Sequence, residues 1–309
     1  MTAVVMGEVL VDLVWRTGAE AVAPVPGGSP ANVALGLHRL GRPVRLATCW
    51  GQDPPGALVG DYLRGTGLPV ARAESASGRT TLALAYVDDR TGAATYDFLA
   101  AWDPLALPVP AEATLLHTGS LAVVVEPGAG RVLEACRAMQ ARPAGAVSVD
   151  LNVRPGVQPD REAYRAAAER IAGAADVVKA SDEDLAWLYP GVPPVTAAGT
   201  LLALGPRLVV VTRGGDGATG LVHGEEVSVP APPVSVVDTI GAGDAFQAAL
   251  LAGLLRRQAD GSHRVVLPGT RGRLERLLTQ AVTAGALACT RLGAQPPTRA
   301  ELADTLGGA

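Results

Sequence analysis

The sequence has 309 residues, which is enough for one large α/β domain or two small ones. Hydrophobic residues make up 48% and charged residues 18%, so the chain can bury a sizeable core. A net charge of −4 and the lack of an apolar run near the roughly 18 residues of a membrane span exclude nucleic acid and membrane as expected partners. The three cysteines are far apart and lack metal-site spacing, which fits a reduced, cytoplasmic protein.

Short β-branched runs alternate with longer runs of helical period along most of the chain. Strands are expected at 3–13, 44–50, 114–120, 146–152, 176–181 and 207–212. Helices are expected at about 30–40, 55–66, 128–142, 161–173, 182–189, 196–204, 242–257 and 274–291. This alternation predicts an α/β fold with a parallel sheet covered on both faces.

One segment interrupts the alternation. Residues 79–102 read as two strands around a turn at Asp88, Asp89 and Arg90, with no helix between them. Such a hairpin usually packs separately, as a lid or a subunit contact, and residues 11–26 are candidates for further strands beside it. Its apolar residues Leu82, Leu84 and Phe98 make a homodimer through this hairpin an open alternative. Residues 259–273 are expected to form a turn-rich loop.

The first glycine-rich stretch, "PVPGGSPANVALGLHRLG", predicts a helix preceded by a flexible turn. Ser29 is expected as the N-cap, Pro30 as the first helical residue and Gly41 as the residue that ends the helix. Gly27 and Gly28 would let the backbone approach a ligand closely, and Asn32 offers a donor and an acceptor at the same place. A capped helix without a ligand is the alternative reading.

The second stretch, "VVDTIGAGDAF", places a glycine turn at the start of an apolar helix. Backbone N–H groups of Gly241, Ala242 and Gly243 would converge at the positive end of the helix dipole, which predicts an anion site. A carboxylate beside bound phosphate is explained if Asp244 accepts the proton of an attacking hydroxyl during phosphoryl transfer. The alternative is that Asp244 only interacts favourably with the helix dipole.

Competing nucleotide-binding motifs do not match. The sequence has no GxxxxGK[ST] motif, and "GAGDAF" lacks a third glycine and lies late in the chain, which disfavours a dinucleotide site. The protein-kinase motifs are also absent.

Together, "GGSPANVALGLHRLG" and "DTIGAGDAF" resemble the two signature regions of the ribokinase-like (PfkB) sugar kinases. "VDLNVRP", "DVVKASDEDL", "VVVTRGGDG" and "ACTRLGAQPP" extend the resemblance along the chain. The resemblance implies one kinase domain over residues 1–309. Its fold would be three-layer α/β/α, with a mostly parallel sheet and a small β-sheet lid from about 11–26 and 79–102.

The family's functional residues transfer by position. Asp244 resembles the catalytic base, and Gly241, Ala242 and Gly243 resemble the anion hole for the γ-phosphate. The sugar-contact positions are those of Asp12, Gly27, Gly28 and Asn32, with Glu126 and Arg154 as weaker matches. The nucleotide-binding positions are Thr212, Gly214, Gly215, Gly217 and Ser181.

Two features of the resemblance concern metal ions. Ser181 and Asp184 stand where the family often has an Asn-x-x-Glu pair, so Asp184 would act on Mg²⁺ indirectly, through water. Some relatives bind a monovalent cation, and activation by K⁺ stays open here. The corresponding positions are Asp238, Ile240, Ala288, Arg291 and Gly293.

The resemblance implies a kinase that uses ATP and Mg²⁺ to phosphorylate a small sugar at a primary hydroxyl. Fructose is the first expectation because "TTLALAYVD", Glu126 and "DLNVR" most resemble fructokinases. A 2-keto-3-deoxygluconate kinase and a ribokinase remain alternatives, and a nucleoside kinase is disfavoured. A sugar-binding or regulatory protein without catalysis is the alternative from another class.

Overall fold

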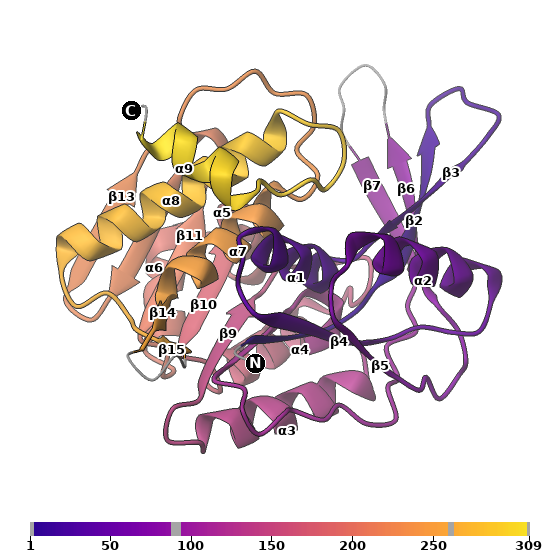
Figure 1. Cartoon of the computed structure of the whole chain (residues 1–309), viewed down its shortest axis with the longest axis horizontal. Coiled ribbons are helices and arrows are strands. Elements are labelled where there is room, and N and C mark those ends of the chain that lie inside the picture. The colour runs from indigo at the N-terminus through magenta and orange to yellow at the C-terminus, as the bar shows by residue number, and fades with distance from the viewer. Residues whose placement is uncertain (1–2, 88–93, 259–262, 308–309) are drawn as a thin grey trace.

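The structure is a computed structural model that describes residues 3–87, 94–258 and 263–307. Within these residues, nine strands form a main sheet in the order β13-β12-β11-β10-β9-β8-β1-β4-β5 (Figure 1). Its neighbours pair in parallel except for β11 with β12 and β12 with β13. The strands are β1 (Ala3–Met6), β4 (Val44–Cys49), β5 (Val70–Ala73), β8 (Leu115–Gly119), β9 (Ala146–Asp150), β10 (Val177–Ser181), β11 (Leu208–Thr212), β12 (Ala218–Val222) and β13 (Glu225–Val229).

Helices cover both faces of this sheet and bury a separate apolar core on each (Figure 1). One face carries α1 (Ser29–Arg39), α2 (Pro54–Thr66), α7 (Ala242–Leu254) and α8 (Arg271–Cys289), with α9 (Arg299–Gly307) against α8. The other carries α3 (Gly128–Gln140), α4 (Arg161–Ala172), α5 (Asp182–Leu188) and α6 (Pro194–Leu202). The predicted three-layer α/β/α fold is confirmed. Among the described residues, no helix is long and apolar enough to cross a membrane.

A second sheet stands apart from the main one and projects from it (Figure 1). It contains β2 (Leu10–Arg16), β3 (Ala23–Gly27), β6 (Thr81–Val87) and β7 (Ala94–Leu99), in the order β3-β2-β6-β7. The predicted hairpin and the extra strands from residues 11–26 therefore share one small sheet. The predicted turn at Asp88, Asp89 and Arg90 lies outside the described residues.

The single strand predicted at 3–13 is wrong. The chain leaves the main sheet after Met6 and enters the second sheet at Leu10, so these residues form two strands in different sheets. The break falls at Gly7, where any side chain would collide with the Pro30 ring at the start of α1.

The end of α7 also differs from expectation. The helix was expected to reach residue 257 but ends at Leu254, and β14 (Leu255–Arg257) then pairs with β15 (His263–Val265). The Leu254 carbonyl accepts the Val266 N–H, so the strand pair replaces the next helical hydrogen bond. The loop expected at 259–273 therefore includes β15 and the first turn of α8; residues 259–262 are not described.

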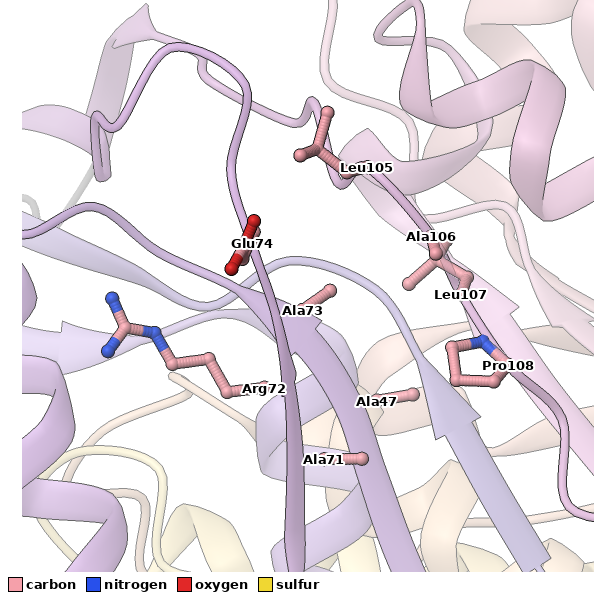
Figure 2. Close-up of a pocket in the computed structure, with 9 residues that line it drawn as sticks. All are labelled: Ala47, Ala71, Arg72, Ala73, Glu74, Leu105, Ala106, Leu107 and Pro108. Carbon is pink, nitrogen blue, oxygen red and sulfur yellow. The ribbon is translucent and has the colours of Figure 1, made fainter.

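A cavity of about 280 Å³ lies beside the edge strand β5, and Figure 2 shows the side chains around it. The strand faces the segment from Leu105 to Pro108 across this cavity. Arg72 donates to the backbone oxygens of Trp50 and Gly51, with its guanidinium carbon 4.4 Å from the centroid of the Trp50 ring. None of the lining residues is a predicted site residue.

Candidate active site

The two glycine-rich stretches meet at Asp244, in the first turn of α7. The Ser29 hydroxyl donates to Asp244 Oδ1 at 2.6 Å, and the Asn32 amide donates to Oδ2 at 2.8 Å. Both donors lie in the first turn of α1, more than 200 residues earlier in the chain. The carboxylate is therefore held in one orientation by two hydrogen bonds, and each oxygen retains a lone pair for another donor.

Ser29 was expected to cap α1, and that expectation is wrong. The helix begins at Ser29, one residue before the predicted first helical residue Pro30; its N-cap is Gly28, and no side chain caps it. The Ser29 hydroxyl donates to Asp244 instead of accepting a helix N–H. The other end agrees with prediction: Gly41 has φ 71°, and the Arg42 and Gly41 N–H groups bond Leu37 and His38 carbonyls, a Schellman motif.

The start of α7 presents free backbone donors. Among the described residues, the N–H groups of Gly241, Gly243 and Asp244 have no acceptor, whereas the Ala242 N–H donates to the Thr239 carbonyl. Gly241 has φ 77°, and a side chain there would lie 2.7 Å from the Ala294 Cβ. Unpaired N–H groups at the positive end of a 13-residue helix suit an anion.

A buried ion pair lies beneath this turn, and sequence reasoning missed it. Lys179 Nζ is 2.7 Å from Asp150 Oδ2, and the two side chains are 4% and 2% exposed. Lys179 Nζ would also lie 3.6 Å from a Cβ on Gly243, so the ammonium group is next to the free N–H groups. A signal was present: Lys179 is the only lysine among the 26 lysine and arginine residues, and it sits in an apolar strand.

A second buried polar group connects α7 to the sheet. The Gln247 amide, one turn beyond Asp244, donates to the Ser148 hydroxyl at 2.9 Å, and Ser148 lies 3.2 Å from His117 Nδ1. Burial, reinforced by the nearby Lys179 charge, lowers the pKa of His117 to about 3, so this imidazole is neutral. Gln247 therefore links the apolar face of α7 to the sheet by a hydrogen bond one turn from Asp244.

The predicted sugar position Asp12 interacts electrostatically with both Arg154 and Asp244. Burial raises the pKa of Asp12 to about 6; the Arg154 charge lowers it and the Asp244 charge raises it further. Gly27 sits beside Asp12 on the paired strand β3, where a Cβ would lie 2.7 Å from Asp12 Oδ2. Gly28, with φ 115°, lies against the Glu8 backbone, so both glycines permit close approach.

The second sheet contacts the same region. A Cβ on Gly156 would lie 2.8 Å from the Tyr96 carbonyl oxygen and 3.4 Å from the Phe98 ring, so β7 packs against the loop that carries Arg154. The Arg154 N–H is fixed by the Tyr164 hydroxyl of α4 at 3.0 Å. Tyr96 was not proposed from sequence, yet its phenol interacts electrostatically with Asp12 and Arg154, and burial raises its pKa.

Glu126 lies elsewhere. Its carboxylate accepts the Gly130 N–H at the start of α3, and it lines a small cavity between α3 and α4 with Arg170. Within the described part of the chain, no contact joins Glu126 to Asp12, Arg154 or Asp244. Its role toward a sugar stays a prediction.

The predicted nucleotide positions lie on adjacent strand ends. Ser181 of β10 is the register partner of Thr212 of β11, and the short 3-10 helix η2 (Gly214–Asp216) follows Thr212. No atom lies within 4 Å of where side chains of Gly214 and Gly215 would begin, whereas a side chain at Gly217 would collide with β13. An open, side-chain-free surface suits a nucleotide.

Ser181 and Asp184 form a capping box at the start of α5. The Ser181 hydroxyl accepts the Asp184 N–H, and Asp184 Oδ2 accepts the Ser181 N–H at 2.8 Å. Asp184 Oδ1 accepts the Val153 N–H at 2.7 Å. Both carboxylate oxygens are thus engaged with backbone, and only their remaining lone pairs face other groups.

The proposed monovalent-cation positions gather around Asp238. Its oxygens accept the N–H groups of Ile240 and Gly293, at 3.0 and 2.8 Å. The Arg291 N–H bonds the Ala288 carbonyl, and the Arg291 side chain turns away to pair with Glu301 at 2.6 Å. The positions are therefore neighbours, and Arg291 could contribute only a backbone group to a cation near Asp238.

Comparisons with known proteins show which family this chain resembles. Residues 2–301 match the pfkB family carbohydrate kinase. A fructokinase of Klebsiella pneumoniae is 34% identical over 297 residues, covering 94% of each chain. A fructokinase double mutant of Vibrio cholerae O395, solved with fructose, ADP and potassium ion, superposes with a TM-score of 0.82 at 28% identity, covering 98% of each chain.

Aminoimidazole riboside kinase of Salmonella enterica, solved with aminoimidazole riboside and an ATP analogue, is equally similar in structure. Its TM-score is 0.82 at 25% identity, and the superposition covers 99% of this chain and 100% of that one. The family match spans nearly the whole chain and includes both glycine-rich turns and Asp244. This chain therefore belongs to the pfkB family of carbohydrate kinases.

Proposed function

We propose that this carbohydrate kinase transfers the γ-phosphoryl group of ATP to fructose, giving fructose 6-phosphate. One observation carries the proposal: Asp244, held by Ser29 and Asn32, lies at a helix start with unpaired N–H groups. A base for the hydroxyl and donors for the phosphoryl oxygens are thus adjacent.

In this proposal Asp244 accepts the proton of the sugar hydroxyl as that oxygen attacks. The hydrogen bonds from Ser29 and Asn32 orient the carboxylate, and the Asn32 amide oxygen remains available to accept from a sugar hydroxyl. A positioned base of this kind contributes about 10²–10⁴-fold to rate.

The N–H groups of Gly241, Gly243 and Asp244 stabilise the charge of the transferred phosphoryl group, with Lys179 adding positive charge beneath them. ATP would supply the phosphoryl group, and the Mg²⁺ ion bound with it would neutralise part of the phosphate charge. The open surface at Gly214 and Gly215 fits the nucleotide. The engaged oxygens of Asp184 fit an indirect role toward Mg²⁺, through water.

Asp12 and Arg154 would hold the sugar beside Asp244, with Gly27 and Gly28 allowing close approach. The second sheet would act as a lid that excludes water from the reaction. A potassium ion near Asp238 would tune the adjoining helix start, in line with the ion bound in the Vibrio cholerae fructokinase.

Fructose is the first choice because the similar curated relatives include fructokinases and a similar solved structure holds fructose. The aminoimidazole riboside kinase keeps a riboside as the second candidate, since it matches the fold equally well. The two substrates differ in the group attached to the sugar ring, which the residues near Asp12 and Tyr96 would have to accommodate.

The test is ADP release with Mg-ATP against fructose, ribose, 2-keto-3-deoxygluconate and aminoimidazole riboside. We expect kcat/KM to be highest for fructose, with the product identified as fructose 6-phosphate by NMR. A higher value for another acceptor would replace fructose. Binding of sugar without ADP release from any acceptor would favour the non-catalytic alternative.

A further inference from the structure

Glu8 is a buried carboxyl group in the connection between β1 and β2. It is 1% exposed, and its Oε2 accepts the Ala122 N–H at 3.2 Å. Hydrogen bonding with Ser120 and Leu121 also favours its charged form. Its other oxygen, Oε1, is buried without a partner in the described part of the chain. The side chain therefore faces the start of the short 3-10 helix η1 (Ser120–Val123).

The backbone around Glu8 is wedged between η1 and the start of α1. A Cβ on Gly28 would lie 2.7 Å from the Glu8 carbonyl oxygen, and one on Gly7 would collide with Pro30 and lie 3.4 Å from the Ala122 Cβ. On the η1 side, Ser120 has a left-handed φ of 57°. The segment Gly7–Glu8 therefore lies between η1 and the first turn of α1, which carries Ser29 and Asn32.

We propose that Glu8 is a positioning residue for phosphoryl transfer: its ionised carboxylate locks η1 against the first turn of α1, and thereby fixes Ser29 and Asn32 on Asp244. Glu8 touches none of the reacting atoms, so it acts through this turn. The inference rests on the proposed function, since the turn matters for rate only if Asp244 is the base.

Only the charged form makes this lock complete. An ionised carboxylate is a stronger acceptor for the η1 backbone N–H groups than a carboxylic acid, because protonation converts one of its oxygens into a donor. The start of α1 and η1 bring no ionisable side chain to it; from α4, Tyr164 faces it, with a pKa raised by its own burial and slightly by Glu8.

Burial raises the pKa of Glu8 from 4.5 to about 7, with the hydrogen bonds from η1 opposing that rise. The lock would therefore form as pH increases through about 7. Because the folded-state pKa lies above the unfolded value, ionised Glu8 lowers folding stability progressively from about pH 4.5 to 7.

The test compares wild type with Glu8→Gln, which keeps the size of the side chain and removes its charge. Glu134→Gln, at an exposed position on α3, is the matched control. We expect Glu8→Gln to raise Tm at pH 8.5 by a few degrees, lower kcat for fructose about tenfold and leave the KM for ATP unchanged. The inflection of kcat near pH 7 should disappear in this variant and persist in the control.

Hydrogen–deuterium exchange at pH 8 tests the lock without turnover. Peptides covering residues 29–32 and 120–123 should exchange at least severalfold faster in Glu8→Gln, while peptides of α5 and α6 should not change. Wild-type exchange in both segments overturns the proposal. So does a fall in Tm with a proportional loss of activity, which would mark Glu8 as merely structural. If wild type phosphorylates no sugar, the proposed function fails, and the exchange data still decide the lock.

Discussion

Asp244 is the residue on which the proposed chemistry depends most directly. Its oxygens accept from Ser29 and Asn32, and the Ser29 hydroxyl can rotate to accept from an amide N–H, so Asp244→Asn should disturb the site little while removing the base. We expect Asp244→Asn to lower kcat by about 10²–10⁴-fold or more, with KM values for sugar and ATP near those of wild type.

Steady-state kinetics with the coupled ADP assay measures this effect. Asp304→Asn, an exposed change on α9, is the control and should retain full activity. Activity of Asp244→Asn within a few-fold of wild type would contradict the assignment of the base.

We expect the ionisation of Asp12 to make sugar binding depend on pH. Its pKa is raised to about 6 by burial, and only the ionised form is a pure acceptor for sugar hydroxyls. About one Asp12 in ten would be ionised at pH 5, so we expect the KM for sugar to rise about tenfold between pH 7.5 and 5. Asp12→Asn should show a high KM that is flat over this range, and the KM for ATP is the internal control. A wild-type sugar KM that does not change down to pH 5 would rule this out.

Lys179 and Asp150 form the buried ion pair beneath the start of α7. Removing only the cation leaves a buried carboxylate without its partner, so Lys179→Met should cost about 3–5 kcal/mol in the free energy of unfolding. The double change Lys179→Met with Asp150→Asn should recover most of that stability, because no charge remains unpaired.

Activity separates structure from function at this pair. We expect kcat to stay low in the double variant, since the positive charge near Gly243 is still absent. Urea unfolding and kinetics on the same preparations measure both effects. Recovery of kcat together with stability would assign Lys179 a structural role alone.

At the scale of an element, the start of α7 depends on one backbone conformation. Gly241 has φ 77° and packs against Ala294, so a side chain is disfavoured by both conformation and space. We expect Gly241→Ala to lower the free energy of unfolding by about 1–3 kcal/mol and to reduce kcat, because the free N–H groups move.

Gly199→Ala in α6 is the matched control. Gly199 lies in a helix, and no atom is within 4 Å of where its side chain would begin. That change should be neutral or stabilise the protein by up to about 1 kcal/mol. Equal effects of the two substitutions on chemical denaturation would show that the Gly241 conformation is not special.

At the scale of the whole molecule, the second sheet leaves apolar side chains in solvent. Trp15, Val25 and Leu99 are 44%, 45% and 72% exposed. Leu82, Leu84 and Phe98, which the sequence offers as dimer contacts, are instead partly buried, and Leu82 and Phe98 pack against apolar clusters of the molecule. The exposed set is the better candidate for a contact with a second copy.

We expect the protein to form a homodimer that Leu99→Asp converts to monomer, because burying a charge at that contact is unfavourable. Light scattering coupled to size exclusion measures the mass. Leu204→Asp, at an exposed apolar position after α6, should leave the dimer intact. A monomeric wild type at micromolar concentration would show that the second sheet is not an interface between two copies.

Much of this protein follows from its sequence because the relevant interactions are local. Helical and strand periods, the Gly41 end of α1, and the glycine turn before Asp244 depend on neighbours a few residues away. These features were sufficient to predict the three layers and the glycine turn that places Asp244 at a helix start.

Only the tertiary structure decided how those parts meet. Ser29 donates to Asp244 and does not cap its own helix, and residues 10–16 belong to the second sheet and not to the main one. Lys179 pairs with Asp150 on the neighbouring strand. Each of these depends on residues far apart in the chain, brought together by sheet register and helix packing. Local sequence carries no record of such partners, because burial, and with it the energy of a polar contact, exists only once the chain has folded.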